Sequence, residues 1–317
     1  TDTNDVIFIG KDAGDGHDTE THNLGIGSAA LGGAIAGGEY NVAVGNYTLD
    51  ALTSGDNNVA VGYNAGTAVT TGGYNTFVGF EAGKTYTGTG DANTAIGTSA
   101  LQAMTTGTQN TALGGNAGYS LTTGGNNVMI GHNAGDGFDT ESNNLAVGKD
   151  ALGGAIAGGE FNVAIGNYTG DAITSGDSNV LVGYQAGSAT TTGGYNVFIG
   201  GSYASFCGAA NTTGSNNIAI GTDAYDAADT ESNNLAIGQA ALGGAVAGGE
   251  KNVAIGNYSL DALTTADFVV AIGYNAGSAT TTGGENTYIG YQAGVLNVTG
   301  SQNTIIGNNS NATATDA

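Results

Sequence analysis

The residues best suited to chemistry in this chain are carboxylates that recur in three similar blocks. Each block opens with Asp-Thr-Glu and continues through Ala-Leu-Gly-Gly-Ala, Ala-Gly-Gly-Glu and Gly-Asn-Tyr. The acids at matching positions are Asp18, Glu20, Glu39 and Asp56, then Asp139, Glu141, Glu160 and Asp177, and finally Asp229, Glu231, Glu250 and Asp267. Carboxylates stacked about 5 Å apart repel by roughly 1 kcal/mol in water. Such columns predict either a bound Ca²⁺ or a solvated acidic edge that blocks sideways strand pairing.

Groups for catalysis are sparse. The chain has three histidines, one cysteine (Cys207) and no tryptophan, and no histidine stands near a serine or cysteine with a repeated acid partner. A glycan-cleaving enzyme needs paired carboxylates and aromatic subsites in one place, whereas the acids here are spread over three blocks. We therefore expect no enzyme, and we rank a polysaccharide-degrading solenoid below structural and binding functions.

Asparagines in Asn-x-Ser/Thr motifs are candidates for modification. The main ones are Asn46, Asn167, Asn257 and Asn297, and the motif also occurs at Asn211, Asn308 and Asn311. Asn46, Asn167 and Asn257 occupy the same position in the three blocks. In a secreted chain these side chains would be able to carry N-glycans, but a sequence rich in Thr and Asn also produces the motif by chance.

A short repeat positions all of these candidates. A branched aliphatic residue followed by Gly occurs 18 times between Gly10 and Gly307; twelve of the 17 intervals are 17 residues, four are 18 and one is 21. We call this residue the repeat Gly. The residue four before it is Asn in 16 copies, which predicts a stacked amide ladder or a turn rather than a ligand contact.

The period predicts an all-β, parallel β-solenoid of about 18 coils of 17–18 residues, with two short strands per coil. A helical repeat would need roughly twice as many residues. The repeat Gly would supply a positive φ or a close backbone approach at a corner. We expect one continuous domain over residues 1–317, a protruding loop at 201–213 in the 21-residue coil, and uncapped ends typical of a segment of a longer fibre.

The two faces of the predicted strand carry different residues. One and three before the repeat Gly stand Val, Ile, Leu or Thr, which share a face and are expected to form the core. The residue between them is then expected to point outward, and this column has ten Ala, one Gly and seven large apolar residues: Phe8, Phe77, Met129, Leu181, Phe198, Tyr288 and Ile305. An exposed apolar stripe favours an oligomer seam, with a parallel trimer preferred. A flattened coil that covers this face internally is the alternative.

The composition excludes several classes of protein. The 317 residues include 27 acids against four Lys and no Arg, with a formal charge of -23, so a nucleic-acid partner is excluded because phosphates would not be neutralised. No run of about 18 apolar residues could cross a membrane as a helix, and no signal-peptide pattern opens the chain. Sixty Gly without any Pro is not a collagen composition.

Strings such as those at 41–45, 93–97 and 252–256, of the form Asn-x-Ala-Val/Ile-Gly, resemble the head repeats of trimeric autotransporter adhesins (YadA-like heads). They are also similar to repeats in phage tail fibres and other surface fibres. The resemblance implies a left-handed β-roll, trimeric association, and an extracellular, cell-surface or virion-surface location. It implies a structural and adhesive fibre without catalysis. The alternative is a tail-fibre-like shaft that binds a host receptor or glycan, with specificity in the 201–213 loop. The lengths of the two ends also permit a head-to-tail filament.

Overall fold

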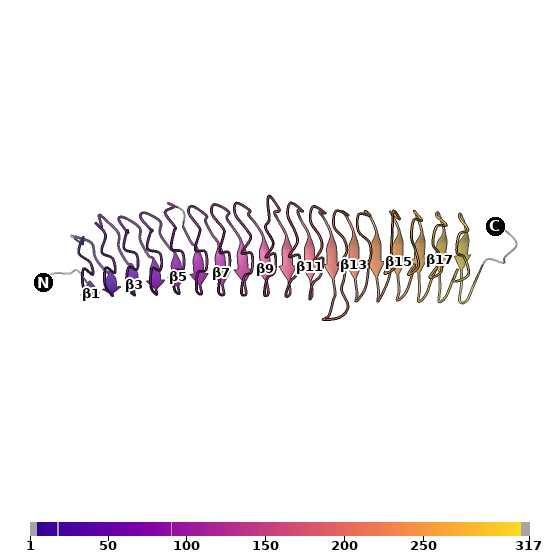
Figure 1. Cartoon of the computed structure of the whole chain (residues 1–317), viewed down its shortest axis with the longest axis horizontal. Helices are drawn as coiled ribbons and strands as arrows, with labels where there is room; N and C mark the ends of the chain where they lie inside the picture. Colours follow the sequence, from indigo (N-terminus) through magenta and orange to yellow (C-terminus); the bar gives the residue numbers. More distant parts are fainter. Residues whose placement is uncertain (1–4, 18, 90, 312–317) are drawn as a thin grey trace. The chain divides into compact units, whose positions relative to one another are not determined.

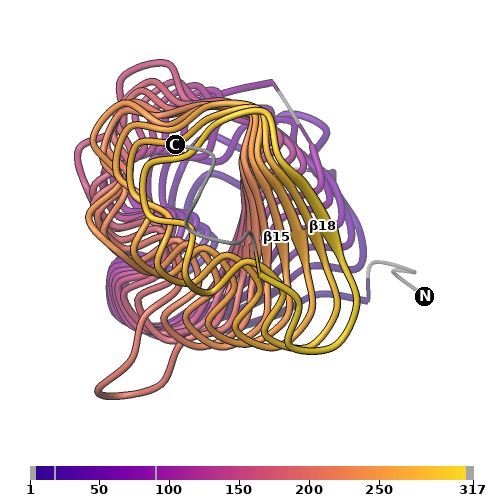
Figure 2. The same cartoon turned by 90° about the vertical axis from the view of Figure 1, so that its right-hand side faces the viewer.

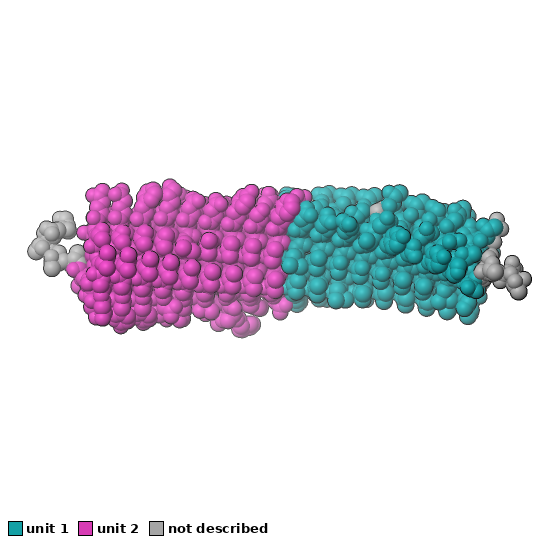
Figure 3. Space-filling model, turned by 180° about the vertical axis from the view of Figure 1, so that it is seen from behind, with its two compact units in different colours: residues 1–158 teal, residues 159–317 magenta. Residues whose placement is uncertain are grey.

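The computed structural model describes residues 5–17, 19–89 and 91–311, and the chain forms two compact units, residues 1–158 and 159–317 (Figure 3). The described residues are all-β and contain no helix. Within each unit, consecutive strands pair in parallel and in register, so that Val42 lies beside Val59 and Val59 beside Thr76. The predicted all-β parallel solenoid is confirmed. Its left-handedness and its continuity from one unit to the next stay predictions.

In the described residues, each unit contains nine strands, one per coil; Figure 1 labels strands along the chain. Unit 1 holds β1 (Ile7–Ile9), β2 (Leu24–Ile26), β3 (Val42–Val44), β4 (Val59–Val61), β5 (Thr76–Val78), β6 (Thr94–Ile96), β7 (Thr111–Leu113), β8 (Val128–Ile130) and β9 (Leu145–Val147). Unit 2 holds β10 (Val163–Ile165), β11 (Val180–Val182), β12 (Val197–Ile199), β13 (Ile218–Ile220), β14 (Leu235–Ile237), β15 (Val253–Ile255), β16 (Val270–Ile272), β17 (Thr287–Ile289) and β18 (Thr304–Ile306).

The predicted second strand of each coil is replaced by stacked turns. Backbone hydrogen bonds still join neighbouring coils there, for example from Leu49 N–H to the Ala65 carbonyl (3.2 Å) and from Thr53 N–H to the Thr70 carbonyl (2.8 Å). Tyr47 and Leu49, however, have φ angles of 59° and 49°, a left-handed conformation that interrupts an extended strand. Figure 2 looks along the coils and shows the strands from β15 to β18 on one side, with turns completing each loop.

The repeat Gly meets both requirements expected of it. Gly62 has a φ of +136°, and a Cβ placed there would lie 2.3 Å from the carbonyl oxygen of Gly79. No L-residue with a side chain fits that conformation and that approach together. The Gly ends each strand and lets successive coils stack closely at the corner.

The inside of each coil is lined by the column that the sequence analysis placed outside. Phe77, Met129, Leu181, Phe198 and Tyr288 are completely buried within one chain, as are the alanines of the column. Ile305 is also buried, and Phe8 is half-buried. The predicted oligomer seam at these seven residues is therefore wrong, and the internally covered alternative holds. Alternation of side chains fixes which residues share a face, but it does not fix which face is inside.

Core packing explains the mixture of Ala and large residues in this column. Ala43 is buried in the same coil as the bulky Leu49, which comes from the turn four residues after the repeat Gly. The large Phe77 instead faces Gly66 and Gly83, and a Cβ at Gly83 would lie 2.5 Å from its ring. Large residues on the strand side are thus matched by Gly on the turn side, which keeps the narrow interior filled without overlap.

The Asn column forms the stacked amide ladder, one of the two structural alternatives that the sequence predicted. In Asn58, the backbone N–H donates to Asn41 Oδ1 (2.9 Å) and Nδ2 donates to the carbonyl of Gly72 (2.9 Å). Its Oδ1 accepts from the backbone N–H and from Nδ2 of Asn75, at 3.1 Å each. These side chains are fully buried, so they satisfy backbone groups where water does not reach.

Candidate functional site

In each block, the glutamate of the opening Asp-Thr-Glu motif accepts hydrogen bonds from backbone N–H groups. Glu20, Glu141 and Glu231 are buried. Glu141 accepts hydrogen bonds from the N–H groups of Asp139 (2.7 Å), Thr140 (3.0 Å) and Gly158 (2.9 Å). Glu231 repeats the arrangement with the N–H of Gly248 at 2.8 Å, and Glu20 with the N–H of Gly37 at 2.9 Å. Each carboxylate therefore holds the turn of the next coil.

The aspartates that end the three columns also accept hydrogen bonds from backbone N–H groups. Oδ1 of Asp56, Asp177 and Asp267 accepts the backbone N–H of the residue that stacks on it, at 2.8 Å in every block. Those N–H groups belong to Glu39, Glu160 and Glu250. Asp139 and Asp229 each accept a threonine hydroxyl, and Asp18 lies outside the described residues.

The calcium hypothesis finds no assembled site in the part of the chain that the structure describes. No group of three or more His, Cys, Asp or Glu side chains is arranged there to hold a metal. The sequence predicted the stacking of these acids with two alternatives, a bound Ca²⁺ or a solvated acidic edge, and the calcium alternative stays a prediction. In the described residues, backbone N–H groups are partners of the three buried glutamates and of Asp56, Asp177 and Asp267, because the turns between coils leave N–H groups that need acceptors.

A different group of aspartates lies five residues after the repeat Gly. Burial raises the pKa of Asp50, Asp136, Asp226 and Asp261 above the usual value. For Asp136 the neighbouring Asp150 carboxylate raises the pKa further. These carboxylates destabilise the folded chain when they are ionised.

The outer face of each sheet is an aliphatic strip. We define it as the residues one and three before each repeat Gly, which are the first and last residues of every strand. None of them is buried, and Ile96, Leu113, Ile220 and Ile289 are among the exposed ones. The sequence analysis placed these residues in the core. The pairing of large strand residues with turn glycines was the sequence signal for the correct face.

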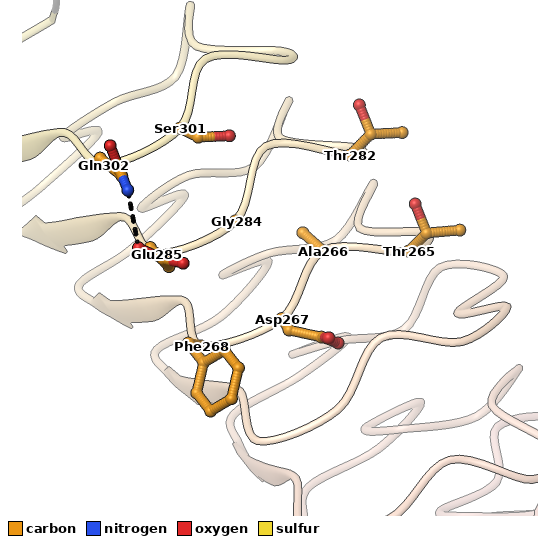
Figure 4. A pocket seen from close by; sticks show the side chains of 9 residues that line it. All are labelled: Thr265, Ala266, Asp267, Phe268, Thr282, Gly284, Glu285, Ser301 and Gln302. Carbon is orange, nitrogen blue, oxygen red and sulfur yellow. Dashed lines mark hydrogen bonds between the residues drawn. The ribbon is translucent and has the colours of Figure 1, made fainter.

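A shallow depression of about 260 Å³ lies on unit 2 (Figure 4). Thr265, Asp267, Phe268, Glu285 and Gln302 are among the residues that line it. Gln302 Nε2 donates to Glu285 Oε2 at 3.0 Å, and Asp267 Oδ1 accepts a hydrogen bond from the Glu250 backbone N–H. Its lining includes no histidine, cysteine or lysine.

The predicted loop is shorter than residues 201–213. Ser202 and Ser205 close a tight hairpin that protrudes between β12 and β13 (Figure 1), with Ser202 N–H donating to the Ser205 carbonyl at 2.6 Å. Tyr203 at its tip is 86% exposed. Cys207 is already back in the core, and burial raises the pKa of its thiol to about 12.

The structure separates the glycosylation candidates. Asn46, Asn167 and Asn257 are exposed. Asn297 is half-buried, and its Nδ2 donates to the Tyr288 hydroxyl (2.6 Å) and the Gly300 carbonyl (3.1 Å). A glycan on Asn297 would break these bonds, so the first three stay as predicted acceptors and Asn297 is unsuited.

No protein family, curated protein or solved structure matches this chain. In the described ranges, no helix is long and apolar enough to span a membrane.

Proposed function

We propose that this chain is the structural shaft of an extracellular or virion-surface fibre, in which copies associate side by side through the aliphatic strip. The observation that carries the proposal is that no residue of this strip is buried within the chain: along the strands of both units its side chains are half-buried or exposed. Nine strands about 4.8 Å apart give a strip about 40 Å long per unit. With a width on the order of 10 Å, its area is about 400 Å², a size at which exposed apolar patches are often functional.

A second copy of the chain is the occupant that fits best. The strip repeats with the spacing of the strands, and an identical array keeps the same register from one coil to the next. A partner with another period would lose that match after a few coils. The excess of 27 acids over four Lys is compatible with this arrangement, because an apolar seam leaves the like charges facing water.

The YadA-like resemblance supports a parallel trimer and an adhesive role. The proposal assigns no catalysis to the chain, and the backbone partners of Glu20, Glu141 and Glu231 support this, because carboxylates held in this way brace turns. A Ca²⁺ ion is not part of the proposal.

The test is the mass of the particle in solution. Sedimentation equilibrium of the wild-type chain is expected to give a multiple of 30.8 kDa. The double substitution Val44→Lys and Val61→Lys charges the strip without touching the core, so it is expected to yield monomers with an unchanged circular dichroism spectrum. Ser54→Lys, on an exposed turn, is the matched control and keeps the wild-type mass. A monomeric wild-type chain would refute the proposal.

A further inference from the structure

Three ladders of exposed and half-buried aromatic side chains follow the strands at equivalent places in the blocks. We name them ladder A (Tyr47, Tyr63 and Phe80), ladder B (Tyr168, Tyr184, Tyr203 and Phe206) and ladder C (Tyr258, Tyr274 and Tyr291). In A and C the first pair of rings is edge-to-face at 5.9 Å and the second is stacked at 5.5 Å. Ladder B begins with the same edge-to-face pair at 5.9 Å and ends in the protruding hairpin.

The rings leave apolar surface open to solvent. Tyr63, Phe80, Tyr274 and Tyr291 are all between 44% and 50% exposed. Stacked rings in direct contact are about 3.5–4 Å apart, so centroids 5.5 Å apart belong to offset rings. Offset rings keep part of each face uncovered. A ladder therefore presents a row of partly open faces along successive coils.

Primary amides accompany the tyrosines. Asn64 follows Tyr63, Gln185 follows Tyr184, and Asn275 and Gln292 follow Tyr274 and Tyr291. Their backbones are fixed between coils, since Asn275 N–H donates to the Asn257 carbonyl at 3.0 Å and Gln292 N–H to the Tyr274 carbonyl at 2.8 Å. Each amide has both donor and acceptor atoms. The residues that carry these amides thus stand at fixed places in the coil, next in the chain to the ladder tyrosines.

We infer that the three ladders are binding sites for neutral oligosaccharides. The C–H faces of pyranose rings suit partly open aromatic faces, and sugar hydroxyls both donate to and accept from amides. The formal charge of -23 disfavours anionic glycans and nucleic acids. A proline-rich peptide also binds aromatic surfaces, but proline has no N–H to donate to the amide oxygens. The sites deepen the adhesive part of the proposed function and do not require the aliphatic strip.

The experiment measures binding of chitohexaose, cellohexaose and maltohexaose to the full chain by saturation-transfer NMR and calorimetry. At least one of these sugars is expected to bind at three sites per chain. Tyr274→Ala/Tyr291→Ala and Tyr63→Ala/Phe80→Ala are each expected to weaken binding at their own ladder by about tenfold or more, the factor that corresponds to about 1.4 kcal/mol. Tyr119→Ala, at a residue that is 43% exposed outside the ladders, is the control and leaves binding unchanged.

Three results would overturn the inference. The first is that none of the three sugars binds, or that the ladder variants bind as the wild-type chain does. The second is tighter binding of a sialylated hexasaccharide or of decaproline. The third is a change of particle mass in the ladder variants, which would assign the rings to self-association. Monomeric wild-type chain that still binds sugar would refute the proposed lateral association alone.

Discussion

Replacement of Asn58 by Ala tests the buried amide ladder. Truncation removes the acceptor for the Asn75 backbone N–H and the donor to the Gly72 carbonyl. Both groups lie inside the coil, and an unpaired buried polar group costs about 1–3 kcal/mol. The expected loss in the free energy of unfolding is therefore about 2–6 kcal/mol, a large part of the usual stability of a domain.

Two measurements report this loss. Urea denaturation followed by circular dichroism gives the change in unfolding free energy, and hydrogen exchange of the Asn75 amide reports local opening, which a repeat protein permits without global unfolding. The control is Asn57→Gly, because Asn57 is exposed and has a φ of 58° that Gly adopts freely. A destabilisation by Asn58→Ala below about 0.5 kcal/mol, the usual range of surface changes, would refute the argument.

Three further outcomes follow from burial. Phe77→Ala is expected to lower the free energy of unfolding, measured by denaturation, by about 3–5 kcal/mol. Phe80→Ala, at an exposed residue, is expected to change it by no more than about 0.5 kcal/mol. The reverse order of the two losses would contradict the assignment of the inner face. Because burial raises the pKa of carboxyls such as Asp50, these groups bind protons more tightly in the folded chain. Their contribution to the melting temperature should therefore rise as pH falls through the raised pKa and level off below the ordinary value of 3.8. Asp50→Asn should raise the melting temperature at pH 7, and a steady fall on mild acidification would count against this. The thiol of Cys207, with its pKa near 12, should resist iodoacetamide at pH 8 until the chain unfolds, and rapid labelling of native protein would show that it is not buried.

At the candidate sites, the sequence predicted which residues stack on one another but not which groups they contact. The stacking of Glu20, Glu39 and Asp56 was predicted because the period places them in one column, but their partners were not. Glu20 and Asp56 accept backbone N–H groups, and Glu39 accepts the Thr21 hydroxyl. Turn geometry depends on left-handed residues such as Tyr47 and Leu49, which no side-chain pattern marks. The aromatic ladders depend on the same corners, and the adjacency of their rings appears only when the coils are stacked.

The sequence by itself determined the period, the position of the strand before each repeat Gly, the corner glycines and the stacking of the Asn column, but it also predicted a second strand per coil that the turns replace. A backbone that repeats every 17 or 18 residues stacks equivalent residues, whatever path it takes between them. Only the tertiary structure decided that Phe77 and Ala43 point inward while Val44 and Val61 point outward. The reason is that side-chain alternation is symmetric with respect to the two faces of a strand, and the direction in which the turns close the coil selects one of them.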